Sequence, residues 1–150
     1  MSVTFQDLKF YESALPGSTG GVITAVEIPK QTVSDLFNDT TQAELEVGGV
    51  AYRKIFLVNT NVSLALNSSV LWLLLPPTSE EAFAFALGTP TDTDPTGLTY
   101  VAPINPGSGV LLGDLISSSP VAIWLRKTTP AGTNTFKRSQ TQICVTGQTP

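Results

Sequence analysis

The feature that most constrains the fold of this chain is the alternation of short apolar segments with clusters of turn-forming residues. The segments are rich in Val, Ile, Thr, Phe, Tyr and Trp, and no window shows a sustained helical period with caps at both ends. Clusters such as Pro16–Gly21, Pro76-Pro77 and Pro130–Gly132 separate them, because Pro fixes φ and Gly permits positive φ. The pattern predicts β-structure throughout.

Eight of these segments are predicted to be strands, and Thr32–Phe37 is the one candidate for a helical turn. About eight strands in one chain indicate an all-β fold, either a β-sandwich or a jelly roll. No change of composition marks a second domain, so residues 1–150 are expected to form a single β-sandwich domain with short flexible termini. The predicted strands are Leu8–Tyr11, Val22–Ile28, Ala51–Asn59, Val70–Leu75, Ala82–Leu87, Leu98–Val101, Val121–Thr128 and Gln142–Thr146.

The charge content argues against several classes of partner. Charged residues make up 13% of the chain, against about 25% in an average protein, and the net charge is -4. The basic residues fall in pairs and form no continuous run, so no nucleic-acid binding is expected. The longest apolar run, Val70–Leu75, is too short to cross a bilayer, and the N-terminal sequence lacks the pattern of a secretory signal. We expect synthesis in the cytoplasm and no membrane partner.

Most catalytic chemistry is excluded by residue type. The chain has no His and one Cys, Cys144, so it cannot build a Ser-His-Asp or Cys-His system or a zinc site of His or Cys ligands. Asp92 and Asp94 lack the further ligands of a calcium loop, and no carboxylate pair has the context of a glycosidase site. No enzyme activity and no cofactor are therefore expected. The other carboxylate pairs are Glu44 with Glu46 and Glu80 with Glu81.

Two predicted strands place a tryptophan where a soluble monomer would show polar residues. In Val121–Leu125 the alternate residues can face the core, which leaves Trp124 on the opposite side. The segment containing Trp72 is apolar on both faces. Either a loop or the N-terminal arm of the same chain covers these tryptophans, or they anchor a subunit interface, where Trp is a favoured residue.

Two blocks of the sequence resemble segments of small virion proteins of tailed bacteriophages. The first is Tyr52–Asn61, a strand that ends in an Asn-Thr turn, and the second is Leu112–Leu115 followed by Val121–Gly132. Their order and spacing also match, and together they cover about a third of the chain. These are structural signatures with no catalytic residue. Arg53 and Arg126 lie in these blocks, either as exposed charges or as bidentate contacts to an acidic patch on a neighbouring subunit.

The resemblance implies a structural protein of the virion, made in the host cytoplasm. The leading hypothesis is a capsid decoration or cement protein that binds copies of itself, as a dimer or trimer, and other virion proteins, above all the major capsid protein. One alternative is a tail, baseplate or head-tail connector subunit, because fold does not fix location in a particle. Another is a receptor- or glycan-binding module that uses Gly88–Gly97, which is expected to be an exposed loop. The interface candidates are Trp72, Trp124, Arg53 and Arg126.

Overall fold

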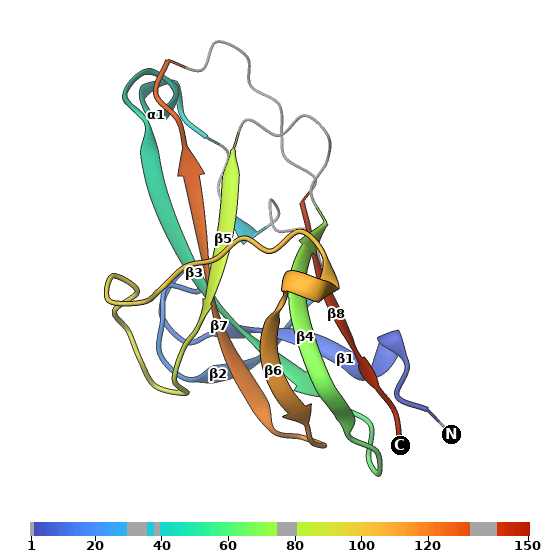
Figure 1. Cartoon of the computed structure of the whole chain (residues 1–150). Helices are drawn as coiled ribbons and strands as arrows, with labels where there is room; N and C mark the ends of the chain where they lie inside the picture. The colour runs from blue at the N-terminus through green and yellow to red at the C-terminus, as the bar shows by residue number, and fades with distance from the viewer. Residues whose placement is uncertain (1, 30–35, 38–39, 75–80, 133–140) are drawn as a thin grey trace.

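A computed structural model describes residues 2–29, 36–37, 40–74, 81–132 and 141–150, which form two antiparallel sheets packed face to face (Figure 1). The larger sheet has five strands in the order β2 (Ile23–Ile28), β1 (Leu8–Ser13), β3 (Gly49–Asn59), β7 (Pro120–Thr129) and β5 (Ala82–Leu87). The smaller sheet has three strands in the order β6 (Val110–Leu115), β4 (Leu66–Leu74) and β8 (Gln142–Gln148). Of the two predicted all-β forms, the β-sandwich is the one observed.

The long pair of β3 and β7 forms the centre of the larger sheet. Its register runs without interruption from Gly49 opposite Thr129 to Val58 opposite Pro120. At the end of β3 the buried side chain of Asn59 donates from Nδ2 to the carbonyl oxygens of Leu64 and Leu115, both at 2.8 Å. This amide fixes the turn that leads into β4 and ties it to the end of β6.

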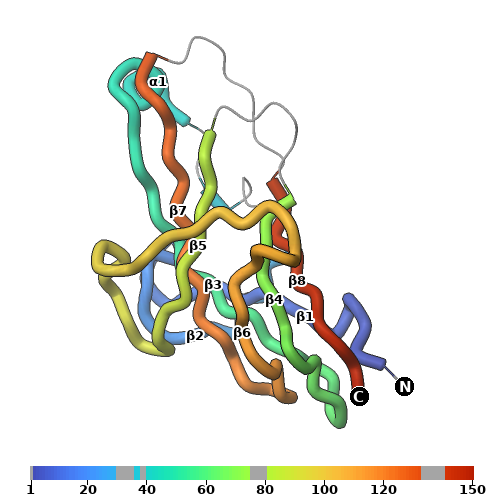
Figure 2. The backbone as a smooth tube through the Cα atoms, in the orientation of Figure 1, coloured from blue at the N-terminus to red at the C-terminus, as the bar shows by residue number. Residues whose placement is uncertain are grey.

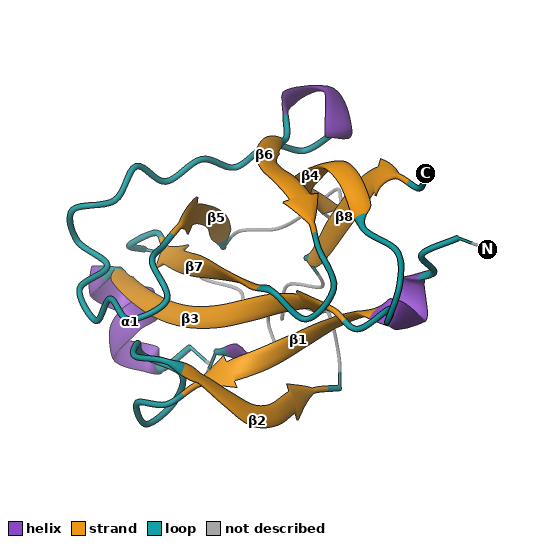
Figure 3. Cartoon of the chain, turned by 90° about the horizontal axis from the view of Figure 1, so that it is seen from below, coloured by secondary structure: helices purple, strands orange, loops and turns teal. Residues whose placement is uncertain are grey.

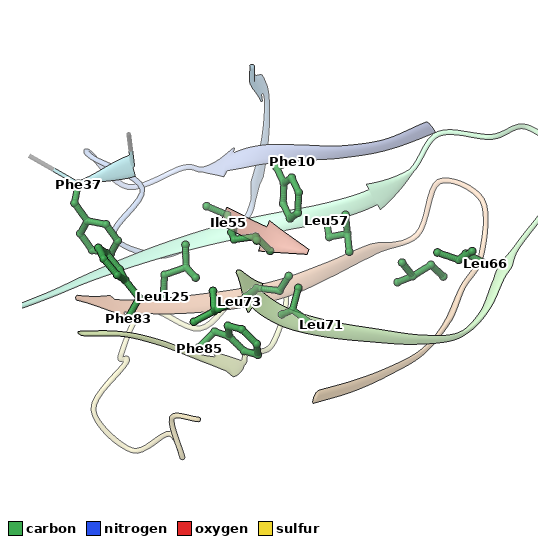
Figure 4. Packing of buried hydrophobic residues seen from close by; sticks show 13 residues of the cluster. Phe10, Phe37, Ile55, Leu57, Leu66, Leu71, Leu73, Phe83, Phe85 and Leu125 are labelled. Atoms are coloured by element: carbon green, nitrogen blue, oxygen red, sulfur yellow. The ribbon is translucent and has the colours of Figure 1, made fainter. Parts of the chain in front are cut away.

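The core lies between the two sheets and is built from alternate residues of the strands (Figure 4). Because successive side chains of a strand point to opposite faces, one set from each sheet meets the facing set from the other. The fully or almost fully buried members include Ile55, Leu57, Leu71, Leu73, Phe85 and Leu125.

The segment after β5 joins the two sheets. Leu98–Val101 was predicted to be a strand, but only Val101 pairs, through an isolated bridge to Phe85. Two residues later the backbone N–H of Leu73 in β4 donates to the carbonyl oxygen of Pro103 at 2.8 Å. The segment after β5 therefore crosses from the edge of β5 to β4. Because it crosses between the sheets, too few of its residues pair with one neighbour to form a strand.

Three short helical segments lie wholly within the described residues: η1 (Phe5–Asp7), α1 (Gln42–Val47) and η3 (Pro106–Ser108). The sequence pattern missed α1, although Thr41 and Glu44 carry the signature of its N-terminus. The hydroxyl of Thr41 accepts from the backbone N–H of Glu44, and the Glu44 carboxylate accepts from the backbone N–H of Thr41 at 2.7 Å. Strand β6 was also missed, and most of the predicted helical turn at Thr32–Phe37 lies outside the described residues.

Candidate functional site

Trp124 lies on the outer face of the larger sheet and has no solvent exposure. Its indole Nε1 donates to Oδ2 of Asp92 at 3.0 Å, and Gly20 and Gly88 come close to its ring. Two segments of the same chain, the loop between β1 and β2 and the loop after β5, therefore cover it. Figure 3 shows the loop after β5 on the side of the larger sheet away from β4 and β8. Of the two alternatives for Trp124, burial under a loop is the one observed, and Trp124 offers no surface to a partner.

The two covering loops are held by a buried lysine. Lys54 of β3 has no solvent exposure, and its Nζ donates to the carbonyl oxygens of Gly21 at 2.8 Å and Asp92 at 2.9 Å. The Asp92 carboxylate forms an ion pair with the same ammonium, which also lies 5.2 Å from the centre of the Phe56 ring. Three acceptors satisfy the three N–H groups of the ammonium, as a buried charge requires.

The carboxylate of Asp92 is held in its charged form. Burial raises the pKa of Asp92, but hydrogen bonds from Lys54, the Thr89 backbone and Trp124 outweigh burial, and the pKa lies below its ordinary value of 3.8. The segment Gly88–Gly97 is a loop, as predicted, but Asp92 anchors it to the sheet. Asp94 is used within its own turn, where it accepts from the backbone N–H and hydroxyl of Thr96.

Arg53, predicted as an interface residue, is satisfied inside the chain. Its Nε donates to the carbonyl oxygen of Leu36 at 3.1 Å, and one terminal nitrogen donates to the carbonyl oxygen of Tyr52 at 2.8 Å. The guanidinium lies 5.4 Å from the centre of the Phe37 ring. Arg53 therefore fixes the segment at Leu36 and Phe37 against the sheet.

Arg126 has a different environment, because it lies on the outer face of the larger sheet, whereas Arg53 lies opposite Leu125 on the core-facing side. Its guanidinium carbon lies 4.8 Å from the centre of the Tyr100 ring, and Tyr52 is its direct cross-strand neighbour. The Tyr52 and Tyr100 rings lie 5.7 Å apart. Within the described part of the chain, the side chain of Arg126 has no hydrogen bond or ion pair, and its buried Nε has no acceptor.

Tyr100 is a fixed platform for this arginine. Its hydroxyl donates to the carbonyl oxygen of Pro95 at 3.1 Å, which ties the ring to the loop after β5. Burial and the nearby Tyr52 raise the pKa of Tyr100 to about 12. The hydroxyl therefore stays neutral at physiological pH. We call Tyr52, Tyr100 and Arg126 the arginine patch.

Trp72 lies at the second candidate site, a pocket beside β8. It stands opposite Cys144 on the outer face of the smaller sheet and is partly exposed, and its Nε1 is buried without an acceptor among the described residues. The pocket has a volume of about 510 Å³. Its walls are formed by Phe5, Leu8, Phe10, Pro29, Trp72, Gln142, Ile143, Cys144, Val145 and Thr146.

Along this pocket β8 has a free edge. Among the described residues, β8 pairs with β4 on one side and with no strand on the other. The other edges are protected: β2 carries the ion pair of Glu27 with Lys9, β6 carries Asp114 and a shift in register, and Val101 bridges to β5. From Thr141 to Pro150 the sequence has no charged residue. An uncharged, unpaired edge is a template for adding a strand.

The remaining carboxylates show no catalytic arrangement among the described residues. Glu44 caps the N-terminus of α1, and Glu46 lies in the same short helix. Glu81 accepts from the Thr40 hydroxyl at 2.6 Å and lies 3.7 Å from the ammonium of Lys127. Glu80 lies outside the described residues. The described residues contain no group of three side chains that could hold a metal ion.

Comparison of the chain with protein-family models, curated proteins and solved structures found no match in any of the three. No helix in the described ranges is long and apolar enough to cross a membrane. The arginine patch and the pocket beside β8 are therefore interpreted from their own geometry. Of the four predicted interface residues, the structure buries Trp124, satisfies Arg53 internally, and leaves Trp72 and Arg126 at two separate surfaces.

Proposed function

We propose that this protein is a structural subunit of a tailed-bacteriophage particle, and that it acts as a decoration or cement protein by binding copies of itself and the capsid shell. The resemblance of Tyr52–Asn61 and Val121–Gly132 to virion proteins supports a structural role in a phage particle. The observation that carries the assembly role is the free edge of β8 beside the Trp72 pocket.

Strand addition at β8 would use both the unpaired edge of β8 and the pocket beside it. Unpaired backbone groups of the edge would give hydrogen bonds, and an apolar side chain of the added segment would fill the pocket. The partly exposed Trp72 forms part of the pocket wall, so an apolar side chain in the pocket would bury more of its surface. The role is mechanical and needs no cofactor.

The test is the native mass of the purified protein by light scattering at micromolar concentration. A dimer or trimer is expected for the wild type, and Thr146→Lys, which places a charge on the exposed edge of β8, should give a monomer. Ala25→Lys places the same charge on the exposed face of β2 and is the matched control, expected to assemble normally. A wild-type protein that stays monomeric even with purified capsid shells would contradict the proposal.

The same measurement separates the alternatives. A ring of about six subunits would favour a tail, baseplate or connector subunit, since tail components tend to form rings. A receptor- or glycan-binding module using calcium at Asp92 and Asp94 would change in mass or stability on addition of chelator. Nothing in the geometry favours this last alternative, because both carboxylates already accept hydrogen bonds within the chain.

A further inference from the structure

The basic side chains of the described residues divide into those with partners and one without. Lys9 pairs with Glu27, Lys54 with Asp92, and Lys127 with Glu81, while Arg53 donates to two backbone carbonyls. Arg126 makes none of these contacts within the described chain, and its Nε is buried without an acceptor. The two terminal nitrogens of the guanidinium are not among the buried unpaired atoms and also lack an acceptor in the described chain, so they are the donors open to a partner.

We propose that the arginine patch of Tyr52, Tyr100 and Arg126 is a binding site for one carboxylate group presented by a protein partner. The site is distinct from the free edge of β8, because Arg126 lies on the outer face of the larger sheet and the pocket lies at β8. The two surfaces would allow one subunit to contact two neighbours.

The geometry prepares the guanidinium for a planar acceptor. Arg126 stands in the middle of the sheet, between Tyr52 of β3 and the small Ala84 of β5. Tyr100 stacks on it at 4.8 Å and is itself held by Pro95. Stacking restricts the guanidinium before binding, so less side-chain entropy is lost when two parallel hydrogen bonds to a carboxylate form.

The surrounding charge selects a carboxylate over a phosphate. Among the residues that the structure describes, Arg126 is the only cation of the patch, and two carboxylates, those of Asp92 and Asp94, lie close enough to Tyr100 to raise its pKa. The whole chain has a net charge of -4. The negative potential from these carboxylates and the net charge still permits a singly charged group to bind Arg126. A phosphate dianion or a nucleic acid would need further basic residues.

Nuclear magnetic resonance can test the site directly, because each arginine Nε–H gives its own signal in a ¹⁵N-labelled protein. The probe is N-acetylglutamic acid amide, which carries one carboxylate, and the matched neutral probe is N-acetylglutamine amide. With the carboxylate probe the Arg126 signal should shift to saturation, and the Arg53 signal, already bonded to Leu36, should not. The neutral probe should move neither signal.

Two variants show whether the guanidinium itself binds. Arg126→Gln should abolish the shift that the carboxylate probe produces at the Tyr100 amide, and Arg126→Lys should bind about tenfold more weakly because it cannot form two parallel hydrogen bonds. The proposal is overturned if Tyr100 still shifts in Arg126→Gln, if Arg53 and Arg126 shift alike, or if inorganic phosphate saturates the site at lower concentration. Loss of assembly in Thr146→Lys leaves this result unaffected, so the two proposals fail independently.

Discussion

Lys54 in β3 and Asp92 in the loop after β5 form an ion pair beneath the outer surface, and Lys54 has no solvent exposure. The same ammonium binds the carbonyl oxygen of Gly21, so one side chain holds two loops against the sheet. These loops cover Trp124 and bring Tyr100 over Arg126. The ion pair therefore helps to hold Tyr100 in place over Arg126 in the arginine patch.

Removing the carboxylate should cost far more stability than breaking an exposed pair. Asp92→Ala leaves the Lys54 ammonium buried without its counter-charge, and we expect the free energy of unfolding to fall by about 3 kcal/mol. Glu27→Ala breaks the partly exposed pair with Lys9 and should cost under about 1 kcal/mol. Urea unfolding of both variants measures the difference, and equal losses would contradict the role given to the ion pair.

The same carboxylate predicts a dependence of stability on acid. The pKa of Asp92 in the folded protein lies below its ordinary value of 3.8, so the stabilisation is present above about pH 4 and is lost as the pH falls through the folded pKa. Unfolding free energy measured from pH 7 down to pH 2.5 should fall more steeply below pH 4 for the wild type than for Asp92→Asn. Parallel curves would show that titration of Asp92 does not contribute to the loss of stability in acid.

Substitution by Phe should reduce stability more at Trp124 than at Trp72. Trp124→Phe removes a hydrogen bond to Asp92 and leaves space in a closed site, so a loss of about 2 to 3 kcal/mol is expected. Trp72→Phe removes no hydrogen bond, and its ring is partly exposed, so it should cost under about 1 kcal/mol while weakening self-association. Chemical unfolding and light scattering test both statements, and a larger stability loss at Trp72 would refute them.

Cys144 reports on the pocket beside β8. Burial raises the pKa of its thiol above the ordinary value of 9.0, so the reactive thiolate is scarce at neutral pH. Alkylation by iodoacetamide at pH 8 should be slower than for a cysteine in an unstructured peptide, and it should slow further as protein concentration promotes assembly. A rate equal to that of the peptide at all concentrations would exclude strand addition at this edge.

The strands were the most predictable part of the fold. Ala82–Leu87 was predicted with its observed bounds, because alternating small and aromatic residues are followed directly by Gly88. Strand β6 was missed because Gly113 and Asp114 interrupt its apolar pattern, and the register of β4 with β6 shifts beside Gly113. Helix α1 was missed although its capping residues are visible in the sequence, because its six residues are too few to show a period.

The functional surfaces were less predictable because they depend on contacts between distant residues. The burial of Trp124 depends on Asp92, which lies in the loop after β5 and binds both the indole and Lys54. Arg53 lies on the core-facing side of the larger sheet and Arg126 on its outer face. The groups that each guanidinium meets there, the Leu36 carbonyl and the Tyr100 ring, come from distant segments of the chain. No local pattern contains that information.

Both ends of the chain lie at one end of the molecule, while the loop that carries Tyr100 lies on the opposite side (Figure 2). A peptide fused to Met1 or Pro150 would thus extend from a region remote from the arginine patch. Phe5 of η1 lines the pocket beside β8, and Pro150 follows β8 by two residues, so both ends lie near the proposed assembly edge. A bulky domain fused at either end should therefore hinder strand addition at β8 and leave the arginine patch accessible, which would separate the two proposed contacts.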